Sequence, residues 1–104
     1  MTEDIESTKE FEGFATVAIV GNIKTAGLIK EVMVAGSKML RIDVPHYKTG
    51  DILVTQYYAG QAIYSITRCT RERAMRFLEE EARLGIFLPE PIREALGINF
   101  QNPF

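Results

Sequence analysis

A single change in hydrophobic period constrains this 104-residue chain more than any other feature. Up to residue 67 the apolar side chains come in five short runs rich in β-branched and aromatic residues, separated by turn residues. From Arg71 onward they recur every three to four residues, which is the period of an amphipathic helix. The connections between the five runs are too short for parallel crossovers. We therefore predict an α+β fold, a five-stranded antiparallel β-meander or small barrel followed by helices.

The predicted strands cover residues 14–20, 26–34, 38–44, 52–58 and 62–67. In the third strand three apolar residues alternate with two charged ones, Leu40, Ile42 and Val44 against Arg41 and Asp43. This period of two is typical of a strand with one buried face. Turn residues after the fourth strand predict a hairpin that leads directly into the fifth.

Two helices are predicted after the strands. Thr70 is a favoured N-cap residue and Gly85 a favoured stop for the first, amphipathic helix. Its apolar stripe consists of Ala74, Met75, Leu78 and Ala82. Pro91, a favoured first helical residue, and Gly97, a favoured residue just past a helix end, bracket a second, short helix.

Length and charge indicate one domain, residues 13–97, between an acidic N-terminal segment (1–12) and an apolar C-terminal tail (98–104). The first 12 residues hold five acids and one lysine, a charge of −4, and the whole chain carries −2, so the remainder carries +2. An acidic chain of this kind is not typical of general nucleic-acid binders.

The counts of reactive residues exclude several kinds of site. A single Cys69 and a single His46 exclude an internal disulfide and a Cys/His zinc site within one subunit, and we expect no cofactor. No apolar run approaches the roughly 20 residues of a membrane-spanning helix. We expect a cytoplasmic protein, because a lone thiol is consistent with a reducing compartment.

Apolar residues on both faces of the predicted strands favour self-association. In residues 52–58, Val54 and Tyr58 lie on one face while Leu53 and Tyr57 lie on the other. One helix of about 14 residues covers one face of such a sheet but not two. We therefore predict a homo-oligomer, with a self-contained barrel as the alternative.

The candidate ligand-binding residues fall into two groups. Polar and aromatic residues on the third and fourth strands form the first group, Arg41, Gln56, Tyr57 and Tyr58. Arginine presents a fixed fork to phosphate, and tyrosine offers a flat surface to a planar ligand. The second group, Arg68, Arg71 and Arg73, lies where a strand becomes a helix, whose first amides attract anions. Ion pairing and rim packing are the structural alternatives for both groups.

Other residues suggest partner binding or chemistry. The tail residues Ile98, Phe100 and Phe104 are candidates for docking on a partner protein. Cys69 precedes a helix N-cap, a position typical of nucleophilic thiols, but a small half-buried thiol is the simpler interpretation. His46 lies in a polar loop with no nucleophile or carboxylate pair nearby, which favours a structural role.

Three motifs resemble a group of short uncharacterised proteins of bacteria and their phages. They are Ala35-Gly36 with Leu40 to Pro45, Thr55 to Tyr58, and Ile63 to Thr67, and the resemblance spans about 50 of 104 residues. Those proteins have His and Arg after the first strand, where this chain has Asn22-Ile23-Lys24, and Thr-Pro in place of Thr67-Arg68. The resemblance implies a mobile genetic element, a setting in which small oligomeric proteins sequester nucleotide immune signals.

These observations together favour a non-enzymatic, homo-oligomeric protein that binds a small anionic, nucleotide-like ligand. The alternative is a protein-interaction adaptor that acts through its acidic N-terminal segment and apolar tail. An enzyme that uses Cys69 or His46 is a third interpretation, from a different class.

Overall fold

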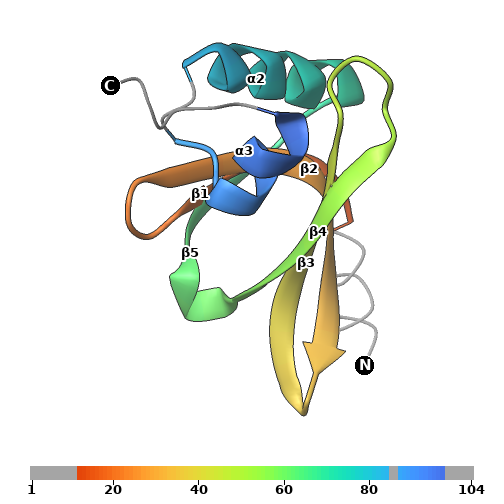
Figure 1. Ribbon diagram of the computed structural model, residues 1–104. Helices are drawn as coiled ribbons and strands as arrows, with labels where there is room; N and C mark the ends of the chain where they lie inside the picture. The colour runs from red at the N-terminus through yellow and green to blue at the C-terminus, as the bar shows by residue number, and fades with distance from the viewer. Residues whose placement is uncertain (1–11, 85–86, 98–104) are drawn as a thin grey trace.

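The computed structural model describes residues 12–84 and 87–97. Five antiparallel strands form one sheet: β1 (Gly13–Ile19), β2 (Ile23–Val34), β3 (Ser37–Pro45), β4 (Ile52–Ala59) and β5 (Ile63–Arg68). A short 3₁₀ turn, η1 (Gly60–Ala62), joins β4 to β5, and the helices α2 (Arg71–Leu84) and α3 (Glu90–Leu96) follow (Figure 1). The predicted α+β fold is confirmed, and each element begins and ends within a few residues of its predicted range.

The strand order β4-β3-β2-β1-β5 differs from the prediction at one connection. The first four strands form a meander, but β5 pairs with β1 and not with β4, so the predicted hairpin between the fourth and fifth strands is wrong. Pairing with β1 sets Ile66 opposite Val17 and Ile63 opposite Ile19, where both isoleucines pack against the buried core. The sheet is open, because its edge strands β4 and β5 are not neighbours.

A glycine within β2 allows the sheet to coil. β2 pairs with β1 through residues 23–29 and with β3 through residues 28–34, so it belongs to both halves of the sheet. At Gly27 an added Cβ would overlap the carbonyl oxygen of Asp43 and lie 3.2 Å from the Cα of Val44. The backbone of β3 therefore approaches β2 at a distance that only glycine permits.

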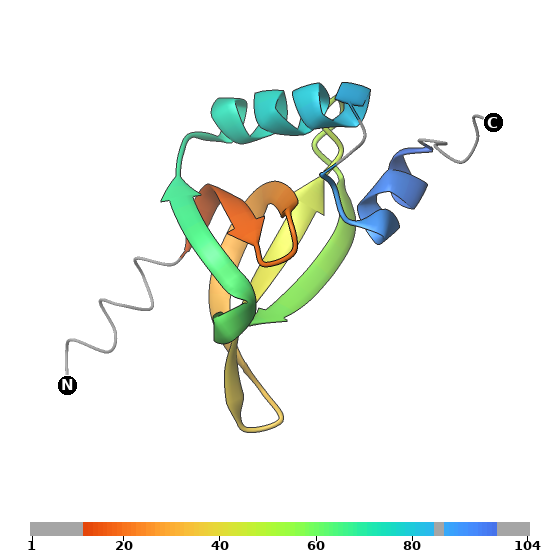
Figure 2. The same ribbon diagram turned by 90° about the vertical axis from the view of Figure 1, so that its left-hand side faces the viewer.

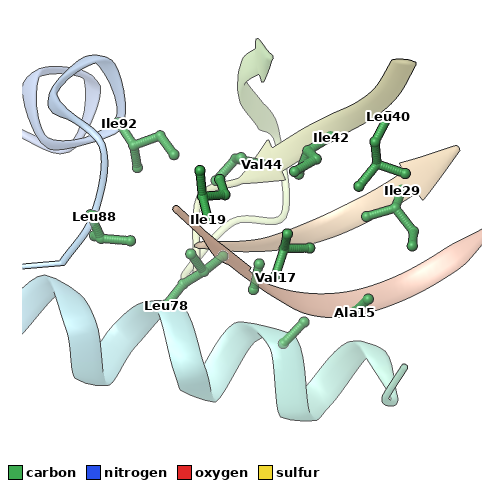
Figure 3. Packing of buried hydrophobic residues seen from close by; sticks show 12 residues of the cluster. Ala15, Val17, Ile19, Ile29, Leu40, Ile42, Val44, Leu78, Leu88 and Ile92 are labelled. Atoms are coloured by element: carbon green, nitrogen blue, oxygen red, sulfur yellow. The ribbon is translucent and has the colours of Figure 1, made fainter. Parts of the chain in front are cut away.

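The core lies between the inner face of the coiled sheet and the two helices (Figure 3). α2 packs on β1 and β2, and α3 packs on β4. Figure 3 shows Leu78 of α2 and Ile92 of α3 pointing toward the buried side chains of the sheet. The predicted alternation in β3 is confirmed, because Leu40, Ile42 and Val44 are buried whereas Arg41 and Asp43 are only partly so. In α2 the predicted stripe is buried at Ala74 and Leu78 and half-buried at Met75 and Ala82.

Both predicted helix caps within the described residues are present. The hydroxyl of Thr70 accepts a hydrogen bond of 3.1 Å from the amide of Arg73, and Gly97 ends α3 in the left-handed conformation with a φ of 77°. The chain between the helices is tied to the sheet, since the Lys24 amide donates to the Phe87 carbonyl at 2.9 Å. The Lys24 ammonium also lies 4.8 Å from the centre of the Phe87 ring.

The predicted terminal segments, except Glu12, and the predicted stop at Gly85 lie outside the described residues. Among residues 12–84 and 87–97, no helix has the length and apolar composition that crossing a membrane requires.

Candidate functional site

The outer face of the sheet carries two adjacent rows of side chains that cross β2, β3 and β4. In one row Lys30 lies opposite Arg41, which lies opposite Tyr57. In the next row Leu28, Asp43 and Thr55 are partners in the same way. Successive strand residues point to opposite faces, so these six side chains share the face that turns away from the core. We call this set the outer-face site.

Hydrogen bonds within the outer-face site orient Arg41. Its Nε donates to Oδ1 of Asp43 at 3.1 Å, and the Thr55 hydroxyl donates to the same oxygen at 2.6 Å. The Asp43 side chain is only 16% exposed, whereas that of Arg41 is 40% exposed. In the described part of the chain the terminal guanidinium nitrogens of Arg41 have no hydrogen-bond partner. Arg41 is thus held by one edge of its fork while the other edge faces solvent.

A hollow of about 570 Å³ lies beside this arginine. Its lining consists of Glu12, Gly13, Leu28, Ile29, Lys30, Arg41 and Asp43. Within the described residues Lys30 forms no ion pair, so its ammonium is available next to Arg41. The volume is in the range of small-molecule sites. Its lining combines apolar surface from Leu28 and Ile29 with two cations, Lys30 and Arg41, and two carboxylates, Glu12 and Asp43.

Two of the predicted site residues lie on the other face of β4. Gln56 is opposite Ile42 and Tyr58 is opposite Leu40, so both point toward the core side of the sheet. The Tyr58 hydroxyl donates to Oε1 of Gln56 at 3.2 Å. Burial raises the pKa of the Tyr58 phenol above its ordinary value of 10.0. Gln56 and Tyr58 therefore do not share a surface with Arg41 and Tyr57.

The three arginines at the junction of β5 and α2 have different neighbours among the described residues. Arg68 donates from Nη2 to the carbonyl of Glu12 at 3.4 Å, at the start of β1. Arg71 lines a separate hollow of about 330 Å³ against Tyr47 and Lys48 of the loop between β3 and β4. The side chain of Arg73 lies on an exposed part of α2.

His46 and Cys69 make local contacts in two different parts of the fold. His46 accepts a hydrogen bond at Nδ1 from the Lys48 amide at 3.0 Å, and its ring lies 5.0 Å from that of Tyr47, which holds the loop between β3 and β4. The amide of Cys69 donates to the Phe14 carbonyl at 3.0 Å, just beyond the pairing of β5 with β1. Its thiol is free and half-buried. Within the described ranges no three His, Cys, Asp or Glu side chains form a group that could hold a metal ion.

The chain matches no protein-family model, no curated protein and no solved structure. Its function is therefore argued from the arrangement of its own side chains. Of the predicted ligand-binding residues, the structure brings Arg41 and Tyr57 together. The predicted partner-binding residues Ile98, Phe100 and Phe104 lie outside the described residues.

Lys30 and Leu28 of the outer-face site were not predicted, although a turn motif in the sequence indicates where they lie. Ala35 and Gly36 form a two-residue turn with φ values of 52° and 83°, which is the conformation of a tight β-hairpin. Such a turn sets Val34 opposite Ser37, and counting back along both strands places Lys30 opposite Arg41.

Proposed function

We propose that this protein is a non-enzymatic, homo-oligomeric binding protein for a small anionic, nucleotide-like ligand, which it holds at the outer-face site. The observation that carries the proposal is Arg41, fixed by Asp43 and Thr55 and placed between Lys30 and Tyr57 at the edge of the 570 Å³ hollow. A guanidinium and an ammonium group on directly opposite residues of neighbouring strands, Arg41 and Lys30, suit a phosphate. The Tyr57 ring and the Leu28 side chain offer apolar surface to a base.

The proposal includes sequestration as the biological role. The resemblance to short phage proteins supports a protein that removes a nucleotide signal of the host's immune system without changing it. We propose a cytoplasmic location, because such signals act in the cytoplasm and a lone thiol such as Cys69 stays reduced there.

Self-association is the second part of the proposal. Large apolar side chains remain exposed at several places on the described surface, among them Met33 at 64%, Val20 at 60% and Tyr64 at 80%. Contiguous exposed apolar surface is typical of protein interfaces. A copy number above one would also multiply the number of ligand sites per particle.

The test of the ligand-binding part is a thermal-shift panel of linear and cyclic nucleotides with wild-type protein. A ligand present at 100 times its dissociation constant adds about 2.7 kcal/mol to the free energy of unfolding, which raises the Tm by roughly 10 °C or more for a domain of this size. Isothermal titration calorimetry then compares variants. Arg41→Gln should weaken binding by about 10- to 100-fold, because it removes a charged hydrogen-bond donor.

Two further variants sharpen this test. Asp43→Asn should strengthen binding of the same nucleotide, since it removes a negative charge next to Arg41. Arg83→Gln is the matched control, because Arg83 is exposed in the last turn of α2 and outside the site. A flat response across the panel refutes the ligand and favours the adaptor, which deletion of residues 98–104 would disable. Equal affinity of wild type and Arg41→Gln refutes the site.

A further inference from the structure

The β2–β3 hairpin extends beyond the rest of the sheet. Figure 1 and Figure 2 show it projecting away from both helices, at the bottom of each view. Residues 33–38 are all exposed, and Met33 is exposed to 64%. The tight turn at Ala35-Gly36 joins the two strands of this ribbon in continuous register. The ribbon therefore presents an apolar side chain on a paired, extended support instead of a loose loop.

An open cleft of about 300 Å³ lies at the base of the same ribbon. It is bounded by the hairpin base, η1 and β5, and its walls are mostly carbon, from Met39, Leu40, Ile63 and Ile66. Two opposite charges stand at the cleft, with Lys38 Nζ 3.9 Å from Glu31 Oε2. Lys38 is 73% exposed, so this long ion pair leaves its ammonium accessible to another carboxylate.

Met33, which we call the knob, and the cleft-lining Leu40 lie on the same face of the β2–β3 ribbon. In the ribbon Met33 lies opposite Lys38, and two residues nearer the core Glu31 lies opposite Leu40. Side chains two residues apart share a face, so the apolar Met33 and the cleft-lining Leu40 point the same way. A two-fold rotation that lays two such ribbons antiparallel, face against face, brings the tip of each over the base of the other.

We infer that a second copy of this chain occupies the cleft, with the Met33 tip of each ribbon inserted between Leu40, Ile63 and Ile66 of the other copy. The same rotation lays the tip row, Met33 and Lys38, over the base row, Glu31 and Leu40, of the other copy. Each Lys38 then lies diagonally across from the Glu31 of the other copy, so unlike charges are neighbours on both sides of the axis. Each copy supplies one knob and one cleft, so the same contact occurs twice, as in an isologous dimer. This inference rests on the self-association part of the proposed function and assigns a surface to it.

The experiment measures the mass of the full-length chain by sedimentation velocity from about 1 to 100 µM. Wild type should be dimeric. Met33→Glu should raise the dimer dissociation constant by at least 30-fold, because it brings a charge to each of two apolar clefts. Leu84→Glu is the matched control, since Leu84 is exposed to 57% at the end of α2, on the side of the molecule away from the ribbon, and does not line the cleft. It should leave the dimer intact.

A second variant blocks the cleft from within the same chain. Gly60 lines the cleft, has no positive φ, and an added Cβ there would meet nothing within 4 Å. Gly60→Tyr should therefore fold, fill the cleft and produce a monomer, and it decides the question if Met33→Glu does not fold. A dimeric wild type that stays dimeric in both variants overturns this interface and leaves self-association standing. A monomeric wild type at 100 µM overturns both, while nucleotide binding is measured separately.

Discussion

Gly27→Ala tests whether the close approach of β2 and β3 shapes the sheet. The new Cβ would overlap the Asp43 carbonyl oxygen and lie 3.0 Å from its carbonyl carbon. These are backbone atoms of a paired strand, so no side-chain rotation relieves the contact, and β3 itself must move. Overpacking typically costs about 1–3 kcal/mol, and a clash that only backbone movement relieves belongs at or above the upper end. We expect Gly27→Ala to lower the free energy of unfolding by about 3 kcal/mol.

Gly60→Ala is the matched control. The added methyl group has open space and the backbone has no positive φ, so this variant should be neutral or more stable by up to about 1 kcal/mol. Urea unfolding followed by far-UV circular dichroism measures both. A loss of about 3 kcal/mol moves the midpoint down by roughly 1–3 M urea. If Gly27→Ala unfolds within about 0.5 kcal/mol of wild type, the reasoning that this glycine permits the coiling of the sheet is refuted.

Three smaller predictions use the same assay. Thr25 is fully buried and its hydroxyl has no hydrogen-bond partner within residues 12–84 and 87–97, so Thr25→Val should stabilise the protein by about 1 kcal/mol, and a loss of stability would contradict this account. Thr70→Ala removes the hydrogen bond to the Arg73 amide and should cost about 1 kcal/mol, whereas no change would mean that the cap contributes nothing. For Tyr58 the raised pKa means that the unfolded chain loses the phenolic proton first, so its contribution to stability is complete below about pH 10 and is lost as the pH rises through the folded pKa. Tyr58→Phe should therefore lose less stability than wild type as the pH rises above about 10, and identical slopes would contradict the burial of this phenol.

Local pattern predicted the elements of this fold but not the last strand pairing. Alternation identified the buried face of β3, and Thr70 and Gly97 marked helix ends, because each signal depends on neighbours in sequence. Ala59-Gly60 looks like a hairpin turn, yet the chain crosses to β1. That choice depends on how far the sheet coils at Gly27, and coiling is a property of strands distant in sequence.

The candidate site was also predictable only in part, because its residues come from three strands whose register the local pattern does not give. Arg41 and Tyr57 were found because arginine and tyrosine are conspicuous on predicted strands. Tyr58 was grouped with Tyr57, although adjacent strand residues point to opposite faces. Lys30 became visible only after the hairpin register placed it beside Arg41. A prediction from residue type alone therefore included Tyr58, which lies on the other face, and omitted Lys30, which the strand register places in the site.

The pairing of β1 with β5 has a consequence for synthesis of the chain. β1 begins at Gly13 and β5 ends at Arg68, so one edge of the first strand has no neighbour until more than half of the polypeptide has left the ribosome. Contacts between segments so far apart in sequence form late and slowly. A nascent or truncated chain that ends before Ile63 would carry Val17 and Ile19 beside an unoccupied edge, in a form open to non-native pairing with other strands.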